Sequence, residues 1–122
     1  MRPIVLSLGE ALFDCFPDRA ILGGAPLNLL VHLQQLLGTH GRGILVSRVG
    51  RDELGQQVLD QLAERGVETD HVQLDDHRPT GTVQVMLSPT GEPSYAILEN
   101  VAWDYIEWNG ELQKLSADCA AI

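Results

Sequence analysis

The stretch GGAPLNLLVHLQQLLG (residues 23–38) decides the fold, because a glycine pair opens it and leucines recur through it at helical spacing. The apolar positions follow the spacing i, i+1, i+4, i+7 and i+8: Leu29, Leu30, Leu33, Leu36 and Leu37. This spacing predicts a helix with one apolar stripe. Pro26 suits the first turn of the helix and Gly38 its end. We expect Leu29, Leu33 and Leu36 to lie in the core.

On the N-terminal side of this helix, Ile4–Leu8 is a short apolar run that predicts a buried strand. Residues 11–16 continue as a second extended stretch and reach a turn at Pro17 and Asp18. Because an apolar segment, residues 20–22, follows that turn directly, this part of the chain predicts a small β-hairpin.

On the C-terminal side, residues 44–47 predict the next buried strand. Asp52 is suited to cap the N-terminus of a second helix, which Gly66 ends. The buried face of that helix is predicted to consist of Leu54, Val58, Leu59 and Leu62. Residues 67–74 predict a third strand. The alternation of strands and helices predicts a parallel sheet of three strands, covered by helices, over residues 4–74.

The pattern changes after residue 80. Residues 82–87 alternate apolar and polar side chains, which is typical of a half-exposed strand. A turn cluster at residues 88–93 and an apolar segment at residues 95–98 complete a predicted hairpin. This hairpin either extends the sheet or projects as a flap over a ligand. Further on, we expect a short helix at residues 111–115 and the first residues of another buried strand at 119–122.

Composition excludes several classes of function. The formal net charge is −9, which disfavours binding to nucleic acids and to anionic membranes. The four histidines and two cysteines show no ligand spacing, so we expect no metal site made by protein ligands alone. The apolar start is too short for a signal sequence, which predicts a cytoplasmic protein with Cys15 and Cys119 reduced.

Two segments could bind a polyhydroxylated ligand: GEALFD (residues 9–14) and GGAPLN (residues 23–28). Gly23 and Gly24 would let a ligand approach the backbone amides. Asp14 could accept hydrogen bonds from two hydroxyls, and Asn28 could both donate and accept. Each residue also has a purely structural explanation, as a turn residue, a hairpin-to-helix junction or a polar residue of a first helical turn. The P-loop and GxGxxG motifs are absent from the sequence.

The motifs GEALFD, GGAPLN, VSRVGRDELG, PTGTVQV and AWD occur in this order between residues 9 and 104. In this order the sequence closely resembles fructokinase-like members of the ribokinase (PfkB) family. The resemblance implies an α/β fold, with a Rossmann-like parallel sheet, flanking helices and a small β-lid. Residues 1–122 would form the N-terminal portion of a ribokinase-like domain, with lid segments at 11–22 and 82–98. The chain departs from the family signature at Leu30.

The resemblance also implies a sugar site. Sugar hydroxyls would meet Asp14, the backbone of Gly23 and Gly24, and the side chain of Asn28. Tyr95 and Ile97, on the second strand of the lid hairpin, would cover the sugar. Asp52, in contrast, is assigned to helix capping.

The activity implied by the resemblance is phosphoryl transfer from MgATP to a sugar hydroxyl, and the spelling of GEALFD and GGAPLN favours fructose. The family's catalytic aspartate and anion hole lie in a Gly-rich motif near the C-terminus of a longer chain. We therefore expect no catalytic residue in this chain. Alone, residues 1–122 are expected to be inactive and to bind neither ATP nor Mg²⁺.

Two other hypotheses stay open. The chain could be a truncated, non-catalytic protein that binds sugar or regulates a full-length kinase, or a fragment without a biological role. The apolar run at residues 119–122 favours a piece of a kinase, since a natural edge strand is normally protected. The family also contains lid-to-lid dimers, so a homodimer through the lid is one assembly that the resemblance allows.

Overall fold

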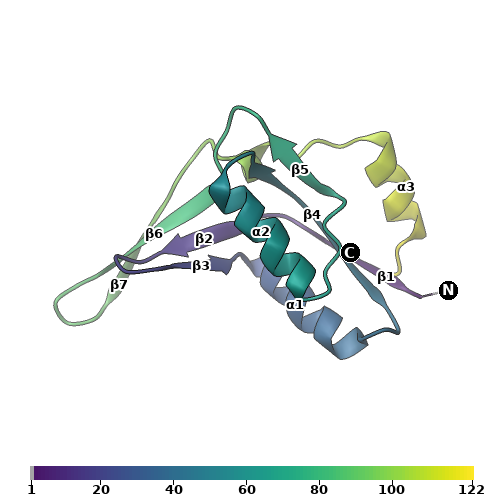
Figure 1. Cartoon of the computed structure of the whole chain (residues 1–122), viewed down its shortest axis with the longest axis horizontal. Helices are drawn as coiled ribbons and strands as arrows, with labels where there is room; N and C mark the ends of the chain where they lie inside the picture. The colour runs from purple at the N-terminus through teal and green to yellow at the C-terminus, as the bar shows by residue number, and fades with distance from the viewer. Residues whose placement is uncertain (1) are drawn as a thin grey trace.

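The computed structural model describes residues 2–122, and its strands form two separate sheets. The main sheet contains three parallel strands in the order β1-β4-β5. Their bounds are Ile4–Leu8 for β1, Arg42–Gly50 for β4 and Val72–Asp75 for β5. Figure 1 shows the second sheet projecting from one end of the main sheet.

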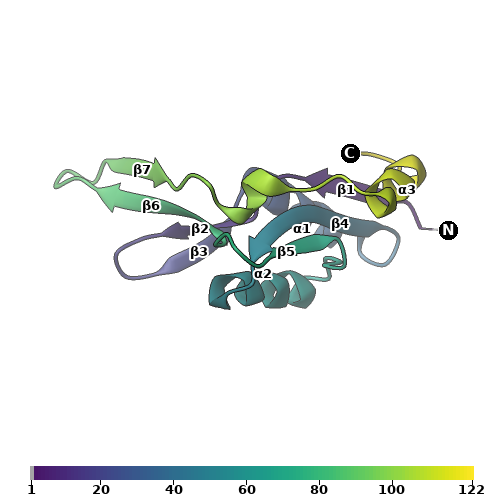
Figure 2. The same ribbon diagram turned by 90° about the horizontal axis from the view of Figure 1, so that it is seen from above.

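Helices cover both faces of the main sheet (Figure 2). Helices α1 (Ala25–Leu37) and α2 (Glu53–Glu64) lie on one face. The 3₁₀ helix η1 (Ala102–Tyr105) and helix α3 (Gly110–Asp118) lie on the other. Within residues 2–122, no helix is long and apolar enough to cross a membrane.

Strand β4 supplies the centre of the core, because its side chains alternate between two buried clusters. Leu45 and Val49 belong to the cluster that contains the buried residues of α1 and α2. Ile44 and Val46 belong to a second cluster with Leu112 of α3. These four side chains are buried on the two sides of the sheet, which explains the apolar run at residues 44–46 of this strand.

The predicted buried face of α1 is wrong in part. Leu29 and Leu36 are 66% and 85% exposed, and Leu33 is half-buried. The buried residues of this helix are instead Leu27, Leu30 and Val31. Leucines occupy both sides of α1, so their spacing alone could not identify the inner side. Gln34 extends the inner side, since its Oε1 accepts a hydrogen bond from the backbone N–H of Gly43 at the start of β4.

The second sheet, called the small sheet below, has four strands in the order β3-β2-β6-β7. Strands β2 (Leu12–Cys15) and β3 (Ala20–Gly23) form one antiparallel hairpin, and β6 (Gly81–Leu87) and β7 (Pro93–Ile97) form another. The two hairpins join through β2 and β6, which pair in parallel. The second hairpin therefore does not extend the main sheet. The chain has the expected α/β class, with a parallel sheet and flanking helices.

Other predicted boundaries shift. Strand β5 begins at Val72, five residues later than expected, because the preceding segment makes only one bridge to β4, between Glu68 and Ile44. Residues 119–122 form no strand. They make one parallel bridge to β1, in which the N–H of Leu6 donates to the carbonyl oxygen of Ala121 at 2.9 Å.

Candidate functional site

Asp14 lies in β2, and its carboxylate rests against the backbone of β3. A methyl group built on Gly23 would lie 3.1 Å from Oδ2 of Asp14, so the carboxylate occupies the space that a side chain at residue 23 would need. Asp14 is half-buried. Within residues 2–122, no protein group donates a hydrogen bond to its carboxylate and no cation pairs with it. Asp14 is therefore a partly desolvated acceptor with free capacity.

Gly24 links β3 to α1 and has a structural reason to be glycine. Its φ of +109° favours glycine, and a methyl group there would lie 2.7 Å from the carbonyl oxygen of Glu10. A methyl group on Gly9 would likewise lie 2.6 Å from Cγ of Pro26. The GEALFD and GGAPLN segments thus pack directly against each other. Their glycines are explained by this contact, whether or not a ligand binds.

Asn28 lies in the first part of α1, one helical turn after Gly24, and its backbone N–H donates to the carbonyl oxygen of Gly24 at 2.9 Å. Asn28 is exposed, and its side-chain amide makes no hydrogen bond within the described chain. No side chain caps α1, and its first turn contains no acidic residue. The positive end of the helix dipole is therefore uncompensated by the helix itself.

Tyr95 and Ile97 lie on β7, with 65% and 64% of their surface exposed. Strand register relates them to Asp14. Val83 of β6 pairs with Asp14 on one side and with Ile97 on the other, and Val85 pairs with Tyr95. Because directly paired residues point to the same side of a sheet, Tyr95 and Ile97 share a face of the small sheet with Asp14. Strand β6 separates them from Asp14, so they do not form one contact cluster.

The structure therefore brings Asp14 and Gly23 together, with Gly24 next in the chain and Asn28 one turn beyond. Tyr95 and Ile97 stand apart on the same sheet face. In residues 2–122, no group of three or more His, Cys, Asp or Glu side chains is arranged to hold a metal ion.

Asp52 has more partners than helix capping requires. Its role as the cap of α2 is confirmed, since Oδ1 accepts a hydrogen bond from the N–H of Gly55 at 2.8 Å. The same oxygen accepts a bond from the Thr80 hydroxyl at 2.7 Å, and Oδ2 accepts one from the Thr80 N–H at 3.0 Å. The Thr80 hydroxyl in turn accepts a bond from the N–H of Gly50 at 2.9 Å.

Burial of the Asp52 carboxyl acts to raise its pKa, but the bonds from Thr80 and Gly55 outweigh burial and hold the pKa below its usual range. Two sequence motifs, VGRDELG and PTGT, thus meet at one carboxylate where β6 enters the small sheet. Sequence reasoning missed this link, because the two segments lie 28 residues apart.

An apolar groove that Asp14 does not line lies beside the edge strand β1. It has a volume of about 590 Å³. Its lining includes Val5 and Leu8 of β1, Leu29 and Leu33 of α1, and Ile122. Leu29 and Leu33 therefore face this groove, which also reaches the first turn of α1 at Ala25 and Pro26.

Comparison with known proteins places these features in a family. A model of the pfkB family carbohydrate kinases matches residues 14–116. The fructokinase of Salmonella typhimurium is 30% identical over 122 residues, which cover 96% of this chain and 39% of that relative. The chain thus spans well under half the length of this relative.

Solved structures agree. The apo form of fructokinase from Vibrio cholerae O395 matches with a TM-score of 0.80 and 29% identity, over 88% of this chain and 38% of that one. The form of that enzyme with fructose, ADP and calcium ion bound has a TM-score of 0.70 at 28% identity, over 86% of this chain and 35% of that one.

Arabidopsis thaliana ribokinase, complexed with ribose and ATP, has a TM-score of 0.84 at 20% identity, over 98% of this chain and 44% of that one, which shows a shared fold. With the family match spanning most of its residues, the chain belongs to the pfkB family of carbohydrate kinases.

Proposed function

We propose that residues 1–122 supply the sugar-binding part of an ATP-dependent sugar kinase, and that the sugar is fructose. The observation that carries this proposal is Asp14, a half-buried carboxylate that has no partner among residues 2–122 and lies next to the uncapped start of α1. Family membership supports the kinase class, and the names of the relatives support fructose.

In the proposed site, the Asp14 carboxylate accepts hydrogen bonds from two sugar hydroxyls, and Asn28 exchanges hydrogen bonds with another. The backbone of Gly23 borders the sugar, because Gly23 lies directly against the Asp14 carboxylate, and Gly24 follows it in the chain. The hydrogen bonds to the Asp14 carboxylate are directional, so they can orient a sugar that has no net charge.

The small sheet would act as the lid of this site. Tyr95 and Ile97 expose large apolar surfaces on the Asp14 face, where they could exclude water from a bound sugar. Met86 and Leu87 of β6 are also exposed, at 65% and 59%. A homodimer through the lid would bury these apolar side chains, and a molecular-mass measurement in solution tests that assembly.

MgATP would supply the transferred phosphoryl group. In this proposal it is held, with the catalytic base, by polypeptide beyond residue 122. The apolar groove beside β1 supports this view, since Leu8 and Leu29 are more than half exposed there and would be covered by further chain. The alternative, a free-standing sugar-binding protein, requires this groove to remain open to water.

The test is a chimaera in which residues 1–122 replace the matching segment of the Vibrio cholerae fructokinase. The chimaera should phosphorylate fructose with ATP, whereas residues 1–122 alone should show no turnover. In the chimaera, Asp14→Ala should raise the KM for fructose by at least roughly 10- to 150-fold, the effect of losing one of its two charged hydrogen bonds, and leave the KM for ATP unchanged. Turnover by the isolated chain, or an unchanged fructose KM, would contradict the proposal.

A further inference from the structure

Asp75 is a buried carboxylate at the point where the chain leaves the main sheet for the small sheet. It ends β5 and is 2% exposed. Its Oδ1 accepts hydrogen bonds from the N–H groups of His77 and Arg78, at 2.9 and 2.8 Å. Its Oδ2 accepts a bond from Nε of Arg48 in β4, at 2.9 Å. The bond from the His77 N–H is the largest of the effects that hold the pKa of Asp75 well below its usual range.

The same network reaches the segment that returns from the small sheet. Arg48 also donates to Oε1 of Gln73 at 3.2 Å. The Gln73 amide binds both backbone groups of Glu107, donating to the carbonyl oxygen at 2.8 Å and accepting from the N–H at 2.9 Å. The Arg78 guanidinium lies 3.4 Å above the ring of Tyr105.

Backbone contacts hold the two segments to each other. The N–H of Ala102 donates to the carbonyl oxygen of Pro79 at 2.8 Å. A methyl group on Gly81 would lie 2.6 Å from the ring of Trp103, so the first residue of β6 packs tightly against the returning chain. The outgoing segment, residues 76–81, and the returning segment, residues 101–107, therefore hold each other in place. The buried carboxylate of Asp75 lies directly before the outgoing segment and binds its His77 and Arg78 N–H groups.

The position of this unit matters for the candidate site because β6 is the strand between Asp14 and Ile97. Val83 pairs with both of them. Because β7 joins the small sheet through β6, a change in the direction of β6 relative to β2 moves β7 relative to Asp14. We propose that Asp75 is a positioning residue for the sugar site, which fixes the direction of β6 through His77, Arg78 and Arg48.

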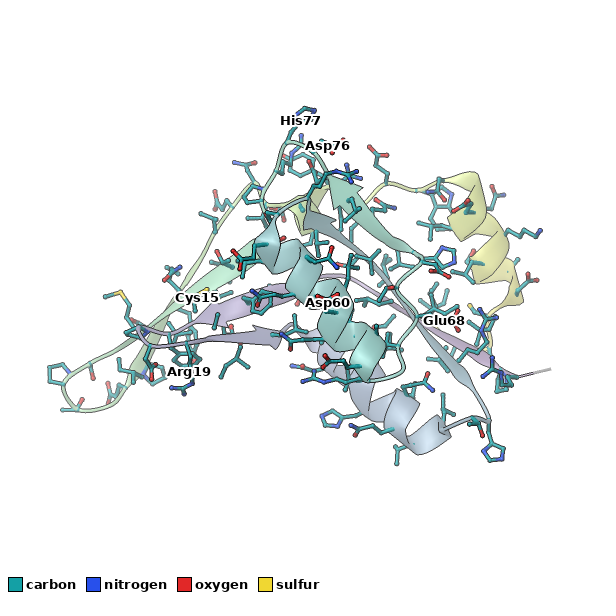
Figure 3. The ribbon with its side chains drawn as sticks, in the orientation of Figure 1. Cys15, Arg19, Asp60, Glu68, Asp76 and His77 are labelled. Carbon is teal, nitrogen blue, oxygen red and sulfur yellow. The ribbon has the colours of Figure 1, made fainter. Side chains whose placement is uncertain are left out.

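The sugar part of this inference rests on the proposed function, but the geometric part does not. Asp76 provides a matched control, since it is the next residue and forms an exposed ion pair with Arg51. Figure 3 shows Asp76 and His77 at the outer end of the loop between β5 and β6, away from the main sheet. Replacing Asp76 removes a carboxylate from the same loop without touching the network.

The test compares Asp75→Asn with Asp76→Asn in residues 1–122 by amide hydrogen exchange and by fructose titration. Asp75→Asn should speed exchange in β6 and β7 by roughly tenfold or more, while β1 and β4 keep their wild-type rates. It should also weaken fructose binding. Asp76→Asn should change neither property. If Asp75→Asn unfolds the chain, Tyr105→Leu, which removes the ring beneath Arg78, should show the same local pattern more weakly.

Equal acceleration of amide exchange in both sheets would overturn the inference, because Asp75 would then stabilise the whole chain and not the small sheet in particular. No acceleration in either sheet would overturn it as well. Local acceleration with unchanged fructose affinity would overturn its sugar part. If the wild-type chain binds no fructose, the proposed function fails, and the exchange pattern still decides whether Asp75 positions the small sheet.

Discussion

Asp52 and Asp14 are carboxylates that lie near the same small sheet, and they differ in what binds them. Both oxygens of Asp52 accept hydrogen bonds from the protein, from Gly55 and Thr80. Asp14 accepts none from residues 2–122 and lies against Gly23 with free capacity. The contrast teaches that folding explains the aspartate of VGRDELG completely. Folding does not explain why the last residue of GEALFD is an aspartate, whereas a bound ligand would explain it.

The largest effect on stability should come from Asp52→Ala. This change removes the cap of α2 and leaves the Thr80 N–H without an acceptor, which should cost about 2–4 kcal/mol of unfolding free energy. Asp14→Ala should change the unfolding free energy by less than about 0.5 kcal/mol. Denaturant unfolding measures both, with Asp60→Ala on the exposed side of α2 as control. Similar losses from Asp52→Ala and Asp14→Ala would break the contrast.

Thr80→Val tests the contrast between Asp52 and Asp14 further, because it removes a single hydroxyl that binds Asp52. The N–H of Gly50 would lose its acceptor and Oδ1 of Asp52 one of its donors, while the volume stays the same. We expect a loss of about 1–3 kcal/mol in the same unfolding experiment. A loss of unfolding free energy as small as that of an ordinary surface substitution would contradict this. It would mean that the buried bonds of Thr80 with Asp52 and Gly50 do not hold the start of β6.

Acid should weaken the base of the small sheet. The pKa values of Asp52 and Asp75 are held below their usual range in the folded chain, so the unfolded chain binds more protons in this region. Their contribution is therefore complete above a pH of about 4 and is lost as the pH falls further. Thermal unfolding from neutral to acid pH should show this decline, and Thr80→Val should make it shallower. A stability that rises on acidification would contradict these assignments.

The smallest effect should come from Ser47→Ala. Ser47 lies in β4 with a fully buried hydroxyl that has no hydrogen-bond partner within the described residues. Unlike Thr80, it has no bond to lose, so its removal should change the unfolding free energy by about 0.5 kcal/mol or less, or stabilise the chain. A loss as large as that of Thr80→Val would reveal a partner such as a buried water molecule.

Sequence patterns predicted the elements of the fold but not all of their inner faces. The order of strands and helices was predictable because buried parallel strands contain short apolar runs, such as residues 44–46 of β4. The inner face of α1 was not, since leucines lie on both sides and Gln34 marks the inner one. The pairing of the two hairpins was expected from family resemblance, because no local pattern encodes the contact between β2 and β6.

The residue types of the candidate site could be predicted from the sequence, whereas most contacts between those residues are seen only in the structure. Gly23 lies beside Asp14, and that contact follows from the β2–β3 register. The roles of Gly24 and Gly9 in packing, and the bond between Asp52 and Thr80, depend on contacts between distant segments. Spacing along the chain carries no information about such contacts, so they could not be predicted from residue types alone.

The most direct test of the account is a fructose titration of residues 1–122, followed by NMR at the backbone amides. The wild-type chain should show weak, saturable shifts centred on residues 14, 23, 24 and 28. Asp14→Ala should abolish them, whereas Asp18→Ala should not, because Asp18 is an exposed residue of the same hairpin that pairs with Arg19. Absence of saturable shifts in the wild-type chain, or the same affinity after Asp14→Ala, would contradict the claim that Asp14 is the sugar acceptor.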